Sequence, residues 1–421
     1  MQTKTFEPGE KVTLITKSKE WTGHVLESHD VNIILLKLES GYNIGIRESE
    51  ILDAKVIKKT SKIRKKEFIE DQKRSLPNIA MIITGGTISS RLDPKTGGVI
   101  STDVRDILNV APELKDIANI VSIESPIMKF SGDMDPGDWK TIAETVLPHL
   151  INQEIDGIIL THGTDTLSYT AAALSFFTQN LNKPIAVTFS QKSIDRGSTD
   201  ASLNLICAAK YATSDIAEVC LIGHEDTNDE TCIAIPATKA RKMHTSKRGT
   251  FKAINSKPLA RITKDNFKIL DEFNAKDLLR IPKIDIKFEN KIAIVKIYPG
   301  ANPDIIDYYE SKGYKGLVLE VTGLGHVPSN NSKNNWIAKI KKIISNGMTV
   351  VAATTTLNGR INMNVYSYGR DLKKTGIISM KDALPETSFV KLGYVLGHKN
   401  WNAKEKLEEN LKREFSDSID L

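Results

Sequence analysis

The chain has 421 residues, of which 40% are hydrophobic and 26% charged, the balance of an ordinary globular protein. It contains no apolar run of the roughly 18 residues that a membrane-spanning helix needs, and residues 1–10 lack the apolar stretch of a secretory signal. Its three cysteines form no CxxC pair, so they predict buried, reduced side chains and give no support to a zinc site. We therefore expect a cytoplasmic protein with no membrane association.

The formal net charge of +6 is concentrated in one short segment. Residues 58–74 carry eight Lys and Arg against three Asp and Glu, whereas residues 1–57 carry seven against nine. Low apolar content makes residues 58–75 a predicted basic linker. A solvated linker is the favoured interpretation, and a segment that touches phosphates is the alternative.

Residues 1–57 form the first predicted domain. Short β-rich runs separated by turn residues, with no helical period, predict a small SH3-like β-barrel. The runs are 12–16, 23–27, 32–38 and 42–46.

From residue 77 onward, apolar strands alternate with amphipathic segments, which predicts a parallel sheet covered by helices on both faces. We expect a larger α/β domain over 76–280 and a smaller one over 290–421. In the larger domain, strands are expected at 79–83, 157–160, 185–189 and 219–222, and helices at 139–150, 167–178 and 201–212. In the smaller domain, strands are expected at 292–297, 317–321 and 349–353, and helices at 305–312 and 336–345.

Two threonine-rich turns follow the first two of these strands, TGGTI at 84–88 and THGTDT at 161–166. Ligands of an open parallel sheet bind beyond the carboxyl ends of its strands, so both turns are expected to meet at one crevice. Their glycines, including Gly86 and Gly163, allow a close approach of the backbone to a ligand. The hydroxyls of Thr87 and Thr164 are then the groups that face the crevice.

Each of these motifs has a structural alternative. TGGTI also suits a tight turn or a phosphate cradle, although neither GxGxxG nor GxxxxGK[ST] is present. THGTDT also suits a helix cap, because Asp and Thr are good N-cap residues. The sequence HED at 224–226 is interpreted as a polar loop at a strand end, because three adjacent residues cannot all face one metal ion.

The pair TGGTIS and THGTDT resembles the two signature segments of the bacterial-type asparaginase and glutaminase family, over residues 77–400. The resemblance implies that Thr87 and Thr164 are the candidate nucleophiles, and that Thr164 acts with Asp165 and a lysine. The family lysine lies a few residues before a Thr-Phe-Lys segment, here 250–252, which assigns Lys242. Without the resemblance, Lys242 is one of several basic residues in a basic stretch.

The resemblance also implies where the substrate binds. Ser131, in FSGDM at 130–134, matches a contact to the substrate carboxylate, and Gly86 and Gly163 lie at further substrate-binding positions. No metal is implied.

These residue types suit the hydrolysis of a carboxamide. A threonine hydroxyl is a weak nucleophile at neutral pH and needs an adjacent base. A buried lysine whose pKa falls well below the reference of about 10.4 can supply that base, and an aspartate can orient it. The threonine then attacks the carboxamide, ammonia leaves, and water hydrolyses the ester, while backbone N–H groups of the two turns are expected to bind the oxyanion.

Residues 89–101 depart from the family pattern. Free asparaginases carry a tyrosine there, shortly after the first threonine, and this chain has none. The Asp93-Pro94 turn and the Gly97-Gly98 pair still predict a mobile lid. We therefore expect low activity from the chain alone.

The N-terminal barrel and the lid without tyrosine together resemble the D-subunit family of archaeal glutamyl-tRNA(Gln) amidotransferases. The resemblance implies an amidohydrolase that passes ammonia from glutamine or asparagine to a partner E subunit, in a heterotetramer built on a homodimer. It further implies that the partner uses ATP and Mg²⁺ and holds most of the Glu-tRNA(Gln), so that no cofactor is expected in this chain. The slightly acidic barrel agrees with that division.

Two other functions remain open from the sequence. One is a stand-alone cytoplasmic L-asparaginase with an accessory domain. The other is a non-catalytic tRNA-handling scaffold, which the intact Thr87, Thr164, Asp165 and Lys242 disfavour.

Overall fold

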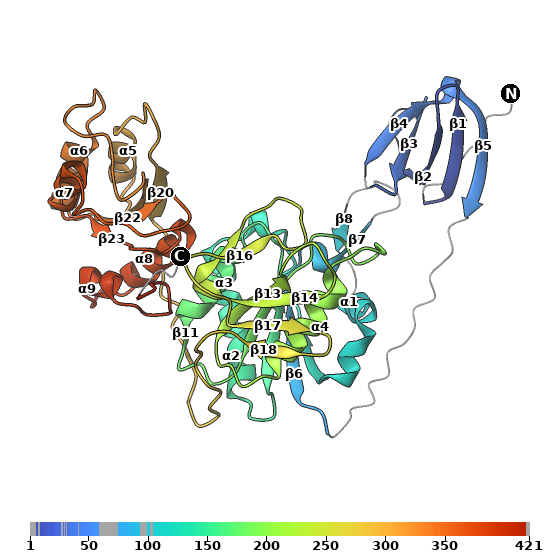
Figure 1. Cartoon of the computed structure of the whole chain (residues 1–421), viewed down its shortest axis with the longest axis horizontal. Helices are drawn as coiled ribbons and strands as arrows, with labels where there is room; N and C mark the ends of the chain where they lie inside the picture. Colours follow the sequence, from blue (N-terminus) through green and yellow to red (C-terminus); the bar gives the residue numbers. More distant parts are fainter. Residues whose placement is uncertain are drawn as a thin grey trace.

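The computed structural model describes residues 6, 9–26, 28, 30, 32–40, 42–58, 75–92, 99–101 and 104–417. The predicted basic linker lies almost entirely outside these residues, and so does the centre of the predicted lid. Figure 1 shows three parts in chain order: a β domain in dark blue, a central α/β domain in cyan to yellow, and a C-terminal α/β domain in orange and red.

The N-terminal domain is a five-stranded antiparallel sheet with the strand order β4-β3-β2-β1-β5. Its small core is built around Val12, Leu14 and Leu36, which alternate with more exposed residues along their strands. The predicted all-β first domain is confirmed, with one strand more than expected. The additional strand, β5, is mostly exposed, so its sequence carries little of the apolar signal by which a strand is predicted. The strands are β1 (Lys11–Thr16), β2 (Glu20–Leu26), β3 (Ile33–Leu38), β4 (Asn43–Arg47) and β5 (Ile51–Lys58).

The central domain is built on an eight-stranded sheet with the order β18-β17-β14-β13-β12-β10-β6-β9. Strands β9, β6, β10, β12 and β13 are neighbours in this order and run parallel, as predicted. Strands β14, β17 and β18 extend the sheet beyond β13 in the antiparallel direction. The predicted parallel sheet is therefore confirmed, and three antiparallel strands that were not predicted extend it at this edge. Its strands are β6 (Asn78–Ile83), β9 (Asn119–Glu124), β10 (Gly157–Thr161), β12 (Ile185–Thr188), β13 (Val219–His224), β14 (Thr231–Pro236), β17 (Ala260–Thr263) and β18 (Phe267–Ile269).

Helices cover both faces of this sheet. Along β6, Ala80 and Ile82 belong to the core that includes helices α2 and α3, whereas Ile79, Met81 and Ile83 belong to the core that includes α1 and α4. This alternation places every side chain from Ile79 to Ile83 in a core, which is why these five residues are an unbroken apolar run. The helices are α1 (Val104–Val110), α2 (Pro136–Ile151), α3 (Leu167–Phe177) and α4 (Ala201–Ala212).

The C-terminal domain contains a four-stranded parallel sheet with the order β20-β21-β22-β23. Helix α6 packs on one face, while α8 on the other face shares a core with α3 of the central domain. The elements are β20 (Ile292–Lys296), α5 (Ile305–Ser311), β21 (Gly316–Val321), α6 (Trp336–Ser345), β22 (Thr349–Thr354), α7 (Ser367–Lys373), β23 (Ile378–Ser379), α8 (Pro385–Leu396) and α9 (Ala403–Glu408).

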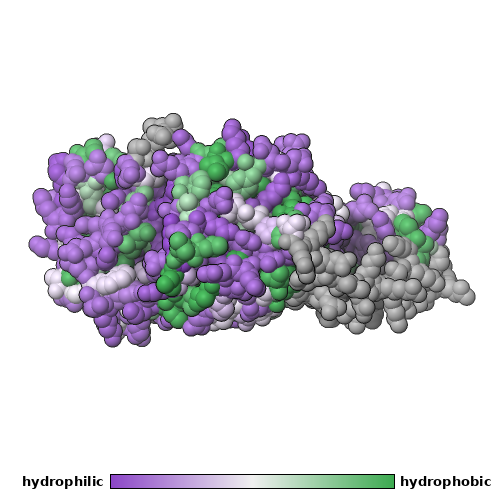
Figure 2. All heavy atoms as spheres, turned by 90° about the horizontal axis from the view of Figure 1, so that it is seen from below, coloured by the Kyte–Doolittle hydropathy of each residue, from purple (hydrophilic) through white to green (hydrophobic). Residues whose placement is uncertain are grey.

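The face of the molecule in Figure 2 is mainly hydrophilic, with hydrophobic residues gathered in small patches. None of the described helices has both the length and the apolar character that a membrane crossing would need.

Candidate active site

The two threonine-rich turns leave the same edge of the central sheet. Strands β6 and β10 pair in parallel with Ile83 opposite Thr161, so both turns begin at the same level. The backbone N–H and the hydroxyl of Thr84 both donate to the carbonyl oxygen of Thr161, at 3.2 and 2.8 Å. The turns are therefore bonded to each other at their first residues.

Glycine is required where the two turns meet. Gly85 and Gly86 have φ angles of +101° and +80°, a region that other residues rarely adopt. A methyl group added to Gly86 would lie 2.4 Å from both Cα and N of Gly163. The second glycine of TGGT thus lets the two backbones touch, which is the convergence that the sequence predicted.

Thr87 begins the short 3-10 helix η2 (Thr87–Ser89), which follows Gly86 directly. The hydroxyls of Ser89 and Ser90 donate to the carbonyl oxygens of Gly85 and Gly86, at 2.9 and 2.7 Å, and hold this helix against the turn. Thr87 itself is half-buried, and its hydroxyl makes no hydrogen bond to any residue that the structure describes. The helix that carries Thr87 is thus attached to the turn by two hydrogen bonds, and the Thr87 hydroxyl has no partner among the described residues.

Lys242 reaches the second turn from another part of the central domain. It ends strand β15 (Ala240–Lys242), which forms a two-stranded pair with β16 (Phe251–Ala253). Its Nζ lies 2.8 Å from Oγ1 of Thr164 and 2.8 Å from Oδ1 of Asp165. The structure therefore brings these three predicted residues into one hydrogen-bonded group, in which the lysine side chain is 19% exposed and the aspartate side chain 74%.

Ser131 lies beneath the second turn, in the short 3-10 helix η4 (Ser131–Asp133). Its Oγ accepts a hydrogen bond from the backbone N–H of Asp165 at 3.1 Å, and its carbonyl oxygen accepts one from the hydroxyl of Thr166 at 2.6 Å. A methyl group on Gly163 would lie 2.7 Å from the Ser131 oxygen. Ser131 and Gly163 are thus in contact beside the lysine group, and the Ser131 hydroxyl can still donate its proton to a ligand.

His162 is a residue of this site to which sequence reasoning assigned no role. It is completely buried, its Nδ1 lies 2.7 Å from the carbonyl oxygen of Gly163, and its Nε2 has no partner in the described chain. Burial lowers the pKa of His162 to about 4, so the imidazole is neutral near pH 7. The only sequence signal for a role of His162 is its position inside the motif THGTDT.

The interpretation of HED at 224–226 as a loop was wrong for His224. This residue ends β13 and is buried, with its ring nitrogens 2.6 Å from Oδ1 of Asn204 and 2.9 Å from Oδ1 of Asp229. Both nitrogens are therefore engaged in polar contacts. In the part of the chain that the structure describes, no group of three His, Cys, Asp or Glu side chains could hold a metal ion.

The sequence matches three described families along its length. Residues 78–274 match the N-terminal asparaginase family, residues 291–409 match the glutaminase/asparaginase C-terminal domain, and residues 6–57 match the GatD N-terminal domain. The D subunit of the glutamyl-tRNA(Gln) amidotransferase of Thermococcus kodakarensis is 44% identical over 87% of this chain and 82% of its own length. The D subunit of the same enzyme from Methanococcus maripaludis strain C7 is 39% identical over 98% of this chain and 99% of its own.

The chain belongs to the D-subunit family of glutamyl-tRNA(Gln) amidotransferases. As a member of this family it is an asparaginase-type amidohydrolase, as the sequence motifs predicted.

Two solved structures carry the same fold as the two α/β domains. The thermostable L-asparaginase from Thermococcus kodakarensis aligns with a TM-score of 0.71 and 26% identity, over 81% of this chain and 100% of its own. The L-asparaginase I from Vibrio cholerae aligns with a TM-score of 0.70 and 27% identity, over the same shares. Together with the described sheets, these likenesses confirm the predicted asparaginase-type two-domain fold behind an N-terminal β domain.

Proposed function

We propose that this chain releases ammonia from the side-chain carboxamide of glutamine by a threonine-nucleophile acyl transfer, for use by a partner protein that converts Glu-tRNA(Gln) to Gln-tRNA(Gln). The observation that carries the proposal is the contact of Lys242 Nζ with both Thr164 Oγ1 and Asp165 Oδ1, at 2.8 Å each. A lysine placed between a hydroxyl and a carboxylate has the geometry of a base with its orienting group.

In this mechanism Lys242 Nζ takes up the hydroxyl proton of Thr164 and remains beside Asp165. The Thr164 oxygen bonds to the carboxamide carbon, and the oxyanion that forms is bound by backbone N–H groups of the two turns. The C–N bond then breaks, and the nitrogen leaves as ammonia with the proton held by Lys242. Water hydrolyses the resulting ester and restores the hydroxyl.

Thr87 is the second candidate nucleophile in this proposal. It lies next to the same junction, because it follows Gly86, whose backbone approaches that of Gly163, the residue before Thr164. Its hydroxyl, which bonds to none of the described residues, favours a direct attack by Thr87, whereas the contact with Lys242 favours Thr164. Both hydroxyls are therefore assigned to the reaction, and an acyl ester trapped on one of them would identify the first to attack. Ser131, Gly86 and Gly163 are proposed to bind the substrate.

The partners in the proposal come from the family. The relatives are named as the D subunit of an amidotransferase, which implies at least one other subunit. We assign to a partner E subunit the use of ATP and Mg²⁺ and the main contact with Glu-tRNA(Gln), and we assign no cofactor to this chain. A homodimer within a heterotetramer suits the site, since the Asp165 side chain is 74% exposed in the single chain and a second copy could cover it.

The test is a measurement of ammonia release from the full-length chain with L-glutamine and L-asparagine, alone and then with the E subunit, ATP, Mg²⁺ and Glu-tRNA(Gln). We expect slow release from the chain alone. If the competent state is populated to about 1% in the isolated chain, the partner can raise the rate by about 100-fold, for about 2.7 kcal/mol of differential binding.

Equal rates in the two conditions, with asparagine as the preferred substrate, would instead support a stand-alone L-asparaginase. The likeness to two L-asparaginase structures over their full length is the observation that favours this second candidate. No release in any condition would support the non-catalytic scaffold.

A further inference from the structure

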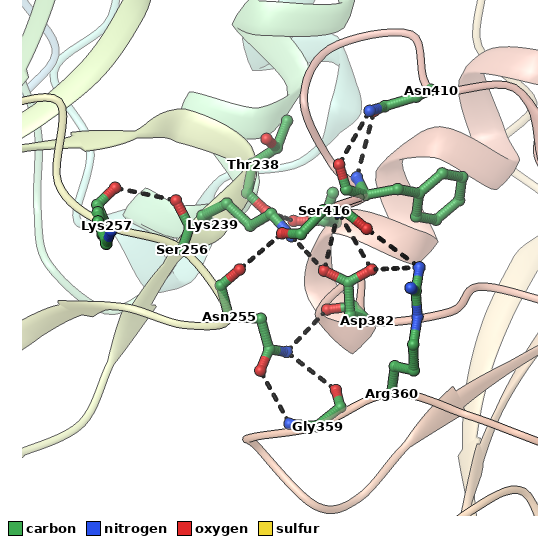
Figure 3. Close-up of polar contacts among 12 residues, drawn as sticks. Thr238, Lys239, Asn255, Ser256, Lys257, Gly359, Arg360, Asp382, Asn410 and Ser416 are labelled. Atoms are coloured by element: carbon green, nitrogen blue, oxygen red, sulfur yellow. Dashed lines mark hydrogen bonds and ion pairs between the residues drawn. The ribbon is translucent and has the colours of Figure 1, made fainter. Parts of the chain in front are cut away.

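Lys239 lies three residues before Lys242, in the 3-10 helix η5 (Ala237–Lys239) that leads directly into β15. Its Nζ lies 2.7 Å from Oδ2 of Asp382 in the C-terminal domain, and the two side chains are 1% and 0% exposed. Figure 3 shows the pair pointing toward each other from the two domains. Removing either partner would leave an uncompensated buried charge, so the pair resists separation.

The carboxylate of Asp382 is also held by hydrogen bonds and a second ion pair. The backbone N–H of Ser416 donates to both of its oxygens, at 3.2 and 3.0 Å, and Arg360 Nη2 lies 3.5 Å from Oδ1. The hydroxyl of Ser416 also accepts from Lys239 Nζ at 3.0 Å and donates to the carbonyl oxygen of Asn255 at 2.6 Å, as Figure 3 shows. The position of Lys239 is therefore set by a network and not by one side chain.

Two further contacts reach η5 and β15 from the first turn of α8. The hydroxyl of Thr387 donates to the carbonyl oxygen of Thr238 at 2.7 Å. Nη1 of Arg241, the residue adjacent to Lys242, lies 3.0 Å from Oε2 of Glu386. The residues four, three and one positions before Lys242 are thus all held by the C-terminal domain.

The strand that pairs with β15 is held in a similar way. The backbone N–H of Ile254, just after β16, donates to the carbonyl oxygen of Lys239 at 3.0 Å. The side-chain amide of Asn255 donates to the carbonyl oxygens of Gly359 and Asp382, at 3.2 and 3.0 Å. The C-terminal domain is therefore bonded both to β15 and to the segment that directly follows β16.

We propose that Asp382 and Glu386 are positioning residues, which hold β15 so that Lys242 Nζ reaches Thr164 and Asp165. This inference rests on the function proposed for Lys242. Neither carboxylate contacts Lys242 or the threonines directly; each acts through a basic residue close to Lys242 in the chain. The C-terminal domain thereby contributes to the chemistry of a site whose named residues lie in the central domain.

The test uses the full-length chain with Asp382→Asn and, separately, Glu386→Gln. We expect the kcat for ammonia release to fall about ten-fold or more, with the KM for the amide substrate changed less than about two-fold, because the displaced group acts on bond breaking and not on binding. Crystal structures of the variants should show Lys242 Nζ and Thr164 Oγ1 more than about 3.5 Å apart, beyond hydrogen-bonding reach. Glu386→Gln keeps the test usable if Asp382→Asn does not fold.

The matched control is Lys391→Met. Lys391 lies on the same helix, α8, in an equally buried pair with Glu414, and it bonds the chain at Leu407 and Glu409 instead of β15. The Lys391→Met substitution should lower the thermal unfolding midpoint without lowering the kcat for ammonia release. An equal loss of kcat in this control would show general destabilisation and overturn the inference.

The inference would also be overturned if Asp382→Asn and Glu386→Gln both folded with unchanged kcat and an unchanged distance from Lys242 to Thr164. Lys242→Met, measured in parallel, separates this outcome from failure of the proposed function. If Lys242→Met retains full activity, the proposed role of Lys242 is wrong, while the distance in the Asp382→Asn structure still reports whether the contact positions β15.

Discussion

The backbone of Gly163 occupies the space in which a side chain at Gly86 would lie, with its Cα and N 2.4 Å from the position of that Cβ. Real Cβ atoms do not approach backbone atoms so closely. Any residue other than glycine at position 86 must therefore push the two threonine-bearing turns apart.

The first prediction is that Gly86→Ala abolishes activity. With φ at +80° and ψ at −178°, an L-residue at position 86 adds about 1–3 kcal/mol of backbone strain to the steric conflict with Gly163. We expect ammonia release to fall by about 100-fold or more, because small displacements of reacting groups are costly, and the thermal unfolding midpoint to fall as well. Gly132→Ala is the control, since a methyl group there would meet nothing within 4 Å. Activity retained by Gly86→Ala would mean that the two turns need not touch.

The second prediction is that Lys242→Met lowers kcat by about 100-fold or more while the fold is retained. Methionine keeps an unbranched side chain of similar shape, one atom shorter, but cannot exchange a proton with Thr164 or pair with Asp165. Far-ultraviolet circular dichroism together with steady-state ammonia release checks it. If the folded variant has a turnover near that of the parent, Lys242 has no catalytic role and is only a charged residue near the surface.

The third prediction concerns the two hydroxyls. Thr87→Val and Thr164→Val each keep the branched shape and remove the oxygen, so each should lower turnover by about 100-fold or more. The controls Thr87→Ser and Thr164→Ser keep a hydroxyl and should retain a larger share of the activity. Rapid-quench mass spectrometry with glutamine should find an acyl ester on one of these residues in the parent chain. Full turnover in either valine variant would remove that hydroxyl from the mechanism.

The two threonine-rich turns of this site could be predicted from the sequence because each consists of consecutive residues that form a recognisable motif. TGGTI and THGTDT follow apolar strands, and the parallel pairing of β6 and β10 brings them together. Lys242 could be assigned only through the resemblance to a family, because its contact with Thr164 spans 78 residues. The contact between Lys239 and Asp382 spans 143 residues and joins two domains, and no pattern in either segment indicates the other.

The burial and the hydrogen-bond partners of individual side chains, which decide their chemistry, could not be predicted from the sequence either. The motif THGTDT does not indicate that the imidazole of His162 is buried. It also does not indicate that Nε2 of this ring lacks a partner among the described residues. The antiparallel strands β14, β17 and β18 were missed for a similar reason. Their pairing direction depends on how the chain returns to the sheet and not on their own composition.

The last prediction follows from that buried imidazole and concerns stability against pH. Burial holds the pKa of His162 at about 4 in the folded chain, below the value of 6.5 expected when it is unfolded. Between these two values the unfolded chain binds a proton that the folded chain does not bind. The free energy of unfolding contributed by His162 is therefore fully present above about pH 6.5 and is lost as the pH falls toward 4.

A lowering of this size corresponds to roughly 3 kcal/mol across the whole interval. His162→Gln removes the titrating group but keeps a polar side chain that can donate to the carbonyl oxygen of Gly163, the contact that Nδ1 makes in the parent. The denaturation midpoint in guanidinium chloride should therefore fall more steeply for the parent than for the variant between pH 7.5 and 4.5. The comparison at pH 7.5 serves as the control, since there the ring is neutral in both states and any difference reports packing alone. If parent and variant lose stability in parallel as the pH falls, His162 is charged in the folded chain, and the neutral imidazole beside the second threonine turn must be abandoned.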